Sequence, residues 1–224
     1  MDTSVGVVKA YLELCGYFVL AELPVRKPLG SGFRDVTDID IIAVRFPHPA
    51  AGGAEMAGNP LNLLLGADPD LEVFERGVDV IIGEVKEGHA ELNPALHRQE
   101  TIEFALRRLG CCPPAEVRKQ AAAIARSGAQ EMRMDGLACR IHLVIFAGRS
   151  GDMHADLVIV PLARCVGFIQ ERMQFAPQAM AGVQWRDPTL AMFALLAKLR
   201  AKGPAGLESS GTSDSISQTT TLSS

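Results

Sequence analysis

The chain has 224 residues, of which 48% are hydrophobic, and its formal net charge is −4 at pH 7. The longest apolar runs fall far short of the roughly 20 residues that a membrane-spanning helix needs, and five cysteines without paired spacing argue against a disulfide framework or a zinc site. The acidic charge gives no overall attraction to nucleic acid, so any such contact has to use a local basic surface.

The N-terminal part of the chain predicts one helix followed by three strands. Apolar residues at helical spacing begin after Ser4, which we expect to be the N-cap of the first helix, and Pro24 should end the first strand. A Gly/Ala/Pro-rich excursion over residues 47–77 predicts a hairpin insertion. In chain order the expected elements are a helix over 4–15, a strand over 17–23, a turn over 28–32, and strands over 37–44 and 78–86.

The C-terminal part of the chain changes to helical periodicity and then returns to strands. Its expected elements are helices over 94–109 and 114–128, strands over 140–146 and 155–160, and helices over 163–173 and 188–202. The Ser/Thr-rich tail over 204–224 lacks large apolar groups to offset its ordering entropy, so we expect it to be disordered. The sequence therefore predicts a single α/β domain over residues 1–203. The start of the chain lacks a signal-peptide pattern, so a cytoplasmic location is expected.

Two of the expected strands carry acidic residues within apolar runs. The first contains Asp38 and Asp40, and the second contains Glu84 and Lys86. Because side chains alternate along a strand, Glu84 and Lys86 should share one face, while Val85 points to the other. If the strands are neighbours, Asp40, Glu84 and Lys86 converge. The plainer alternative is an exposed edge strand with a surface Glu84–Lys86 ion pair worth well under ~1 kcal/mol.

The converging arrangement predicts a divalent-metal site with a lysine beside it. Mg²⁺, or Mn²⁺ in its place, prefers oxygen ligands from one or two carboxylates together with retained waters, which Asp40 and Glu84 can supply. The carbonyl oxygen of Val85 is a plausible third ligand, because Val85 lies between two residues that face the site. Lys86 is placed to orient an attacking water, to help lower its pKa, or to stabilise the transition state of phosphodiester hydrolysis.

The order of elements and these motifs resemble the PD-(D/E)xK phosphodiesterase superfamily, which includes restriction endonucleases and Holliday-junction resolvases. Asp40 matches the first acidic position of that family, and Glu84-Val85-Lys86 matches its (D/E)xK signature. The resemblance covers about residues 5–160. It implies a restriction endonuclease-like α-β-β-β-α-β core with a mixed central sheet flanked by helices, and a magnesium-dependent nuclease that acts on nucleic acid, most simply DNA.

The resemblance also suggests supporting residues and partners. Asp38 and Asp79 are candidates for supporting the metal site, and Arg118, Lys119 and Gln120 match a basic or glutamine position that some relatives carry on a core helix. Many relatives also carry a glutamate on the first helix, where this chain has only Glu13, expected to face solvent. Many relatives act as homodimers.

Two alternatives remain open from the sequence. The first is a nuclease fold that no longer cuts and instead binds nucleic acid or a protein, since fold does not fix function. The second is a polymerase-beta-type nucleotidyltransferase, whose Gly-Ser and DxD motifs would correspond to Gly30, Ser31, Asp38 and Asp40. Here the interval between the two motifs is short, and Lys86 would have no role.

Overall fold

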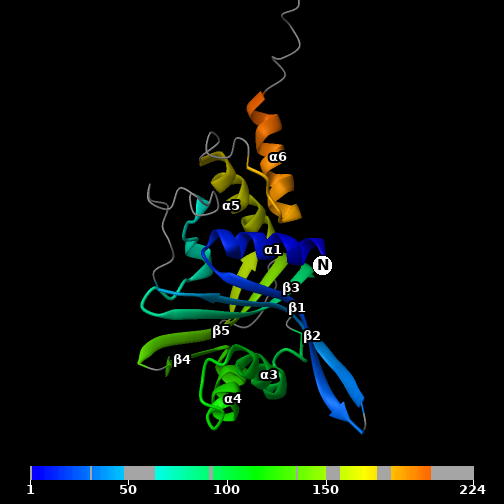
Figure 1. Cartoon of the computed structure of the whole chain (residues 1–224), viewed down its shortest axis with the longest axis vertical. Helices are drawn as coiled ribbons and strands as arrows, with labels where there is room; N and C mark the ends of the chain where they lie inside the picture. Colours follow the sequence, from blue (N-terminus) through cyan, green and yellow to red (C-terminus); the bar gives the residue numbers. More distant parts are fainter. Residues whose placement is uncertain are drawn as a thin grey trace, which may run out of the picture.

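A computed structural model describes residues 2–30, 32–47, 64–90, 93–134, 136–149, 157–175 and 183–202. The elements run in the order α1 (Thr3–Leu14), β1 (Phe18–Leu29), β2 (Gly32–Arg45), η2 (Pro69–Leu71), β3 (Val78–His89), α3 (Gln99–Leu109), α4 (Val117–Ser127), β4 (Ala129–Met134), β5 (Leu137–Arg149), β6 (Val158–Pro161), α5 (Leu162–Phe175) and α6 (Pro188–Lys202). The protein is an α/β structure with one mixed sheet of six strands, flanked by helices. Figure 1 shows α1, α5 and α6 on one face of this sheet and α3 and α4 on the other.

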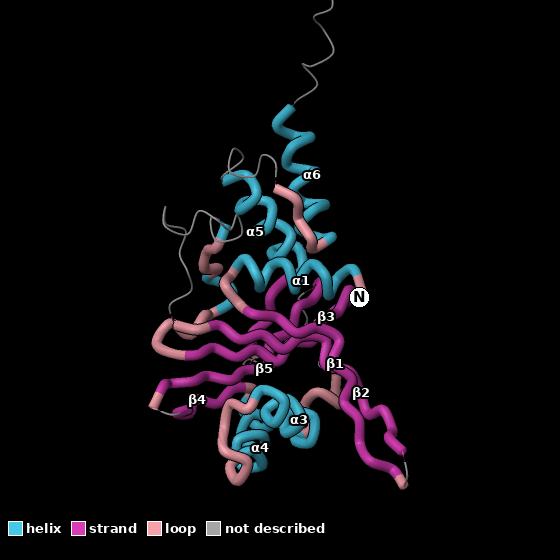
Figure 2. Tube along the Cα trace, in the orientation of Figure 1, coloured by secondary structure: helices cyan, strands magenta, loops and turns pink. Residues whose placement is uncertain are grey.

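The sheet has the strand order β1-β2-β3-β5-β4, and β6 also pairs with β5. β2 runs antiparallel to both of its neighbours, β1 and β3, whereas β3 and β6 run parallel to β5. Figure 2 shows the strands as a layer between two groups of helices. The strands predicted around Asp40 and Glu84 are therefore neighbours near the middle of the sheet, which is the condition under which their side chains converge.

The N-terminal elements are confirmed, with corrections to their ends. The strand expected over 37–44 begins at Gly32, and the strand expected over 78–86 continues to His89. Asp2, not Ser4, is the N-cap of α1, and its side chain accepts a hydrogen bond from the backbone amide of Ser4 at 2.8 Å. The strand expected to end at Pro24 instead continues to Leu29. Proline has no backbone N–H. It is tolerated in β1 because β1 is an edge strand, so no strand on its outer side needs that donor.

The sequence prediction missed β4. This strand has few β-branched or aromatic residues, and it is held by antiparallel pairing with the first half of β5. The Asp135-Gly136 dipeptide is a hairpin signal that could have revealed it, and Gly136 has a positive φ of 89°.

The expected insertion is described only in part. Residues 48–63 of it lie outside the described residues, as does the tail over 204–224. The described part of the insertion contains the short 3-10 helix η2.

The later helices are confirmed, although α3 begins five residues after the expected start. Asn93 accepts a hydrogen bond from the backbone of Ala95 at 2.9 Å, so this segment turns before the helix begins at Gln99. The bounds of α6 agree with the prediction.

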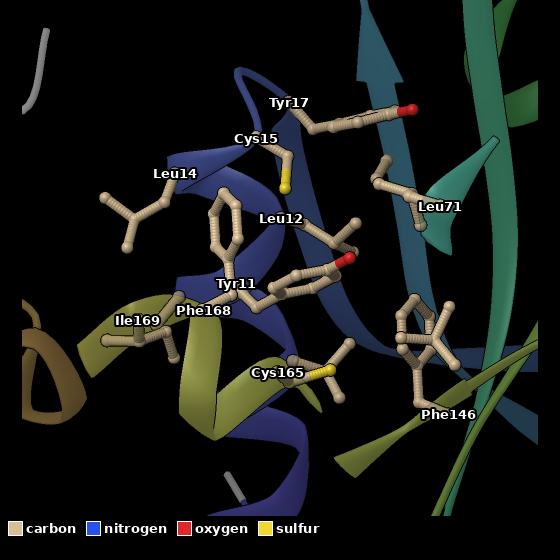
Figure 3. Packing of buried hydrophobic residues seen from close by; sticks show 14 of the residues in the cluster. Tyr11, Leu12, Leu14, Cys15, Tyr17, Leu71, Phe146, Cys165, Phe168 and Ile169 are labelled. Carbon is tan, nitrogen blue, oxygen red and sulfur yellow. The ribbon is translucent and has the colours of Figure 1, made fainter. Parts of the chain in front are cut away.

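Two apolar cores fill the spaces on either side of the sheet. The core between the sheet and α1, α5 and α6 centres on Tyr11, whose ring packs edge-on against Phe146 and Phe168, as Figure 3 shows. The second core packs α3 and α4 against the opposite face, with Ile82, Ile102 and other aliphatic residues buried there. The central strands are thus covered on both faces, so a carboxylate on them is buried unless the strands separate.

Candidate functional site

The candidate site lies where two neighbouring strands separate. The pairing between β2 and β3 ends at Ile41 and Gly83. Beyond this point β2 pairs only with β1, while β3 continues along β5. In Figure 1 the hairpin formed by β1 and β2 extends away from the rest of the sheet. Asp40 and Glu84 are the first residues past the last pair, so both carboxylates lie at the fork.

The fork is bridged by a side chain instead of a backbone ladder. The Oδ2 atom of Asp40 accepts a hydrogen bond from the backbone amide of Val85 at 2.8 Å. Gly83 permits close packing just before the fork, because a Cβ there would lie 3.1 Å from both Ile41 and Phe146. The separation of the strands therefore fixes Asp40 against the backbone that carries Glu84.

Glu84 is buried, although it is charged and sits on a central strand. Its side chain is only 3% exposed, and its Oε1 atom lies 2.5 Å from Lys86 Nζ. Its Oε2 atom is buried and has no hydrogen-bond partner in the described structure. The alternative of a surface Glu84–Lys86 pair is therefore wrong for Glu84, and one of its oxygens remains available to a ligand.

Burial shifts the acidity of both carboxyl groups in the same direction. Burial raises the pKa of Asp40, and the hydrogen bond from Val85 and the charge of Lys86 offset this only in part. Burial also raises the pKa of Glu84; the bond to Lys86 opposes the shift and the charge of Asp40 adds to it. The two groups thus lose their protons less readily than exposed carboxyls, because each charge lacks sufficient compensation.

An open cleft of about 500 Å³ lies beside the fork. Its charged lining is mostly acidic, with Lys86 as the exception. The residues that line it are Asp2, Ser4, Val5, Glu22, Pro24, Asp38, Asp40, Val85, Lys86 and Glu87. Asp40 and Lys86 share this cleft, and Val85, expected on the other face of its strand, also lines it. Glu84 does not line the cleft and is joined to it by its ion pair with Lys86.

The donor set at the fork fits a hard divalent cation in its chemistry. Asp40 and Glu84 provide carboxylate oxygens, and the unpartnered Oε2 atom of Glu84 is a buried acceptor without a donor. Across the described ranges, however, no three His, Cys, Asp or Glu side chains form a ready-made metal-binding group. A cation held here would therefore complete its coordination with waters or with backbone oxygens such as the carbonyl of Val85.

The two supporting candidates differ in position. Asp38 is exposed and lines the cleft. Asp79 is fully buried near the start of β3, five residues before Glu84, where it is bonded to Tyr17, Phe74, Arg140 and His142. Asp79 does not line the cleft, and its bonds to these neighbours give it a structural role; its support of a metal site stays a prediction.

Two other groups of residues singled out in the sequence lie away from the cleft. Arg118, Lys119 and Gln120 are on α4, and none of them lines the cleft. Glu13 on α1 pairs with Lys9 at 2.9 Å and also lies outside it.

The structure also separates the two motifs of the nucleotidyltransferase alternative. Gly30 lies in the hairpin turn between β1 and β2, whereas that reading requires Gly-Ser at the start of a helix. Ser31 is outside the described residues. Asp38 and Asp40 lie further along β2, near the fork, so the structure removes the main support for this alternative.

Sequence reasoning missed three acidic residues of the cleft, Asp2, Glu22 and Glu87. Glu22 is flanked by the pairs Ala21–Ile41 and Leu23–Ile39, so it lies opposite Asp40. The signal was a glutamate inside the predicted strand over 17–23. Its register could not be counted back from the hairpin turn, because a shift between Val25 and Arg26 changes the pairing by one residue.

The comparisons with known proteins identify no relative. No family model matches the chain, and neither does any curated protein or solved structure. Within the part of the chain that the structure describes, no helix has both the length and the apolar character required to cross a membrane. Any assignment of function therefore depends on the geometry of the fork.

Proposed function

We propose that this protein is a divalent-metal-dependent phosphodiesterase of the PD-(D/E)xK type, a nuclease that acts most simply on DNA. The observation that carries the proposal is the buried Glu84 carboxylate, which has one unpartnered oxygen and lies at the strand fork beside Asp40 and Lys86. Burying a charge without full compensation is costly, so its presence on a central strand calls for a ligand of opposite charge.

In this proposal Asp40, Glu84 and the carbonyl of Val85 hold Mg²⁺ or Mn²⁺. When bound, the cation supplies Lewis-acid chemistry: it lowers the pKa of water and neutralises charge on the phosphate. Asp40 is fixed for this role by the amide of Val85. Lys86 lies at the cleft wall with its ammonium beside Glu84, where it can donate to an attacking water or to a phosphate oxygen.

The element order supports the proposal at the level of the fold. One helix, three antiparallel strands and a helical segment are followed by β4 and then by β5, which runs parallel to β3. Apart from the added β4, this is the order expected of a restriction endonuclease-like core. The proposal includes contacts of Arg118, Lys119 and Gln120 with nucleic acid, a homodimer as a possible assembly, and a cytoplasmic location. These parts rest on the resemblance in sequence.

The decisive experiment combines cation binding with cleavage. Isothermal titration with Mg²⁺ and Mn²⁺ should show binding to the wild type and its loss in Asp40→Ala, because Asp40 supplies a ligand. Cleavage of plasmid, single-stranded and branched DNA should depend on the cation and disappear in the same variant. The control is Asp35→Ala. It removes an exposed carboxylate from the same strand as Asp40, and this carboxylate forms an ion pair with Arg26. Absence of nicking on every substrate, with cation affinity unchanged by Asp40→Ala, would refute the proposal.

A second candidate is a module with this fold that binds nucleic acid or a protein without cutting. Two observations favour it: Lys86 already occupies one oxygen of Glu84, and the described residues include no ready-made group of three metal ligands. It predicts nucleic-acid or protein binding that Asp40→Ala leaves unchanged, with no cleavage under any cation.

A further inference from the structure

Glu22 occupies an unusual place in β1. Its φ of 53° is in the left-handed region, which residues other than glycine rarely adopt. It lies opposite Asp40, between the pairs Ala21–Ile41 and Leu23–Ile39. Its Oε1 atom accepts a hydrogen bond from the backbone amide of Asp2 at 2.8 Å, which ties it to the start of α1. The side chain is thereby fixed where β1, β2 and α1 meet.

The surroundings of Glu22 are strongly acidic. Five carboxylates line the cleft against one ammonium, that of Lys86; they belong to Asp2, Glu22, Asp38, Asp40 and Glu87. Like charges this close repel one another, so the arrangement favours binding of a cation.

A separate observation points to the same ligand. Only 2% of the surface of residue Glu84 is exposed, and its Oε2 atom has no hydrogen-bond donor in the described structure. Its ion-pair partner Lys86 lines the cleft. So does Asp40, whose charge adds to the effect of burial in raising the pKa of Glu84. A buried acceptor without a donor needs a ligand that brings positive charge or protons.

The register places Glu22 and Glu84 on opposite sides of Asp40. Asp40 is one residue past the Ile41–Gly83 pair, which puts it beside Glu84 on β3, while Glu22 lies beside it on β1. Three adjacent strands thus each contribute one carboxylate at the same level of the sheet. Divalent cations such as Mg²⁺ keep several waters when bound, and these waters extend the reach of a site to carboxylates beyond the direct ligands.

We propose that Glu22 belongs to the divalent-cation site and holds the waters of the bound ion from the β1 side. This inference rests on the proposed function, because it concerns the same cation. The strained backbone of Glu22 is consistent with it, since such conformations persist where the surrounding structure imposes them and are enriched at functional sites. Glu22 acts here as a positioning residue, whereas Asp40 and Glu84 supply the direct ligands.

The test is a cation titration of Glu22→Gln in the full chain. This variant keeps an oxygen that can accept from the amide of Asp2, so it removes the charge and leaves the fold in place. Mn²⁺ affinity by isothermal titration should fall about tenfold or more, while the Tm in EDTA stays within a degree or so of the wild type. The matched control, Glu13→Gln, removes the same charge outside the cleft and should leave Mn²⁺ affinity unchanged.

A second variant keeps the inference testable if Glu22→Gln folds poorly. Glycine suits the left-handed conformation, so Glu22→Gly should raise the Tm in EDTA and still lose Mn²⁺ affinity. A residue with only a structural role predicts the reverse, a lower Tm and unchanged affinity. Unchanged Mn²⁺ affinity in both variants, with affinity lost in Asp40→Asn, would overturn the role of Glu22 and leave the proposed function standing. Absence of Mn²⁺ binding to the wild type would overturn both.

Discussion

Strand β3 carries two buried carboxylates, Asp79 near its start and Glu84 toward its end, and their surroundings are opposite. Asp79 accepts from Tyr17 at 2.7 Å and from the amide of Phe74 at 3.0 Å, and it contacts the side chains of Arg140 and His142. In the described structure Glu84 has one ion-pair partner, Lys86, and one oxygen without a hydrogen-bond donor. The two groups lie on one strand at nearly the same depth, so burial alone does not distinguish them.

The difference appears in the acidity of the two groups. Burial raises the pKa of Asp79, but the bonds from His142, Arg140 and Tyr17 outweigh it and hold this pKa well below its ordinary range. At Glu84 burial is the larger effect, and the pKa lies above its ordinary value. A fully bonded buried carboxylate stabilises the fold, whereas an incompletely bonded one lowers stability and is retained where a ligand can complete it. The comparison separates an acid whose bonds are complete from the acid on which the proposed function rests.

The strongest test of this separation is Asp79→Asn. The change leaves Arg140, which is 17% exposed, without its charged partner, so we expect a loss of about 3–5 kcal/mol in the free energy of unfolding. Urea denaturation followed by circular dichroism measures it. The control is Asp70→Asn, because Asp70 is 56% exposed and lies 3.5 Å from Arg164; it should cost less than about 1 kcal/mol. Equal losses in the two variants would contradict the structural role of Asp79.

The functional end of the strand is tested by Lys86→Met. Without the ammonium, cleavage should fall about 10²–10⁴-fold, the usual effect of losing a proton-transfer or charge-stabilising group. Mn²⁺ affinity should be retained or increase, because Glu84 is released from its 2.5 Å ion pair. The control Lys198→Met removes an exposed lysine of α6 outside the cleft and should not alter the rate of cleavage. Cleavage that survives in Lys86→Met would show that Lys86 has no catalytic role.

Glu84→Gln should stabilise the metal-free protein. The folded chain holds the Glu84 proton to a higher pH than the unfolded chain, so it binds more protons in the window above the ordinary pKa of 4.5. The free energy of unfolding therefore falls as pH rises through this window and stays lower above it. Glu84→Gln removes this loss, and we expect a gain of about 1 kcal/mol, or roughly 2–4 °C in Tm, at neutral pH in EDTA.

The pH profile of the same variant supplies the check. The difference in Tm between Glu84→Gln and the wild type should shrink as pH falls toward 4.5, because the wild-type carboxyl then becomes neutral. Asp79→Asn should show the opposite behaviour. The contribution of Asp79 is complete above its ordinary pKa of 3.8 and is lost only as pH falls toward the lowered value. A difference for Glu84→Gln that is constant from pH 4 to pH 8 would contradict the assignment of the charge penalty to Glu84.

How much of this was predictable depends on the range of the interactions involved. The sharing of one face by Glu84 and Lys86 follows from strand alternation, which is a local property, and the sequence predicted it correctly. The bonded surroundings of Asp79 could not be predicted, because its partners Tyr17, Arg140 and His142 come from β5 and from the segment before β1, and no local pattern brings them together. Burial of a carboxylate was predictable from the apolar strand around it, but its bonding was not.

The position of Glu22 shows a different limit. The hairpin turn fixes the pairing of β1 with β2 near its tip, but the register shift between Val25 and Arg26 moves the partner of Glu22 by one residue. Glu22 therefore lies opposite Asp40 because of this register shift, which the alternating pattern of the strand does not predict. The fork itself was equally hidden, because it depends on where β2 and β3 stop pairing and not on either strand alone.

The smallest expected effect concerns the basic residues of α4, which lie outside the cleft. If Arg118 and Lys119 contact phosphates, the double variant Arg118→Gln, Lys119→Gln should weaken binding to every DNA sequence alike. It should also reduce the slope of log affinity against log salt by about 2, one for each lost contact. Fluorescence anisotropy in Ca²⁺ across a salt series measures both quantities. The control is Arg26→Gln, Lys27→Gln on the β1–β2 hairpin, whose cations pair with Asp35 and Glu100. A larger change in slope for the hairpin variant than for the α4 variant would move the nucleic-acid contact from α4 to the hairpin that leaves the sheet at the fork, next to Asp40.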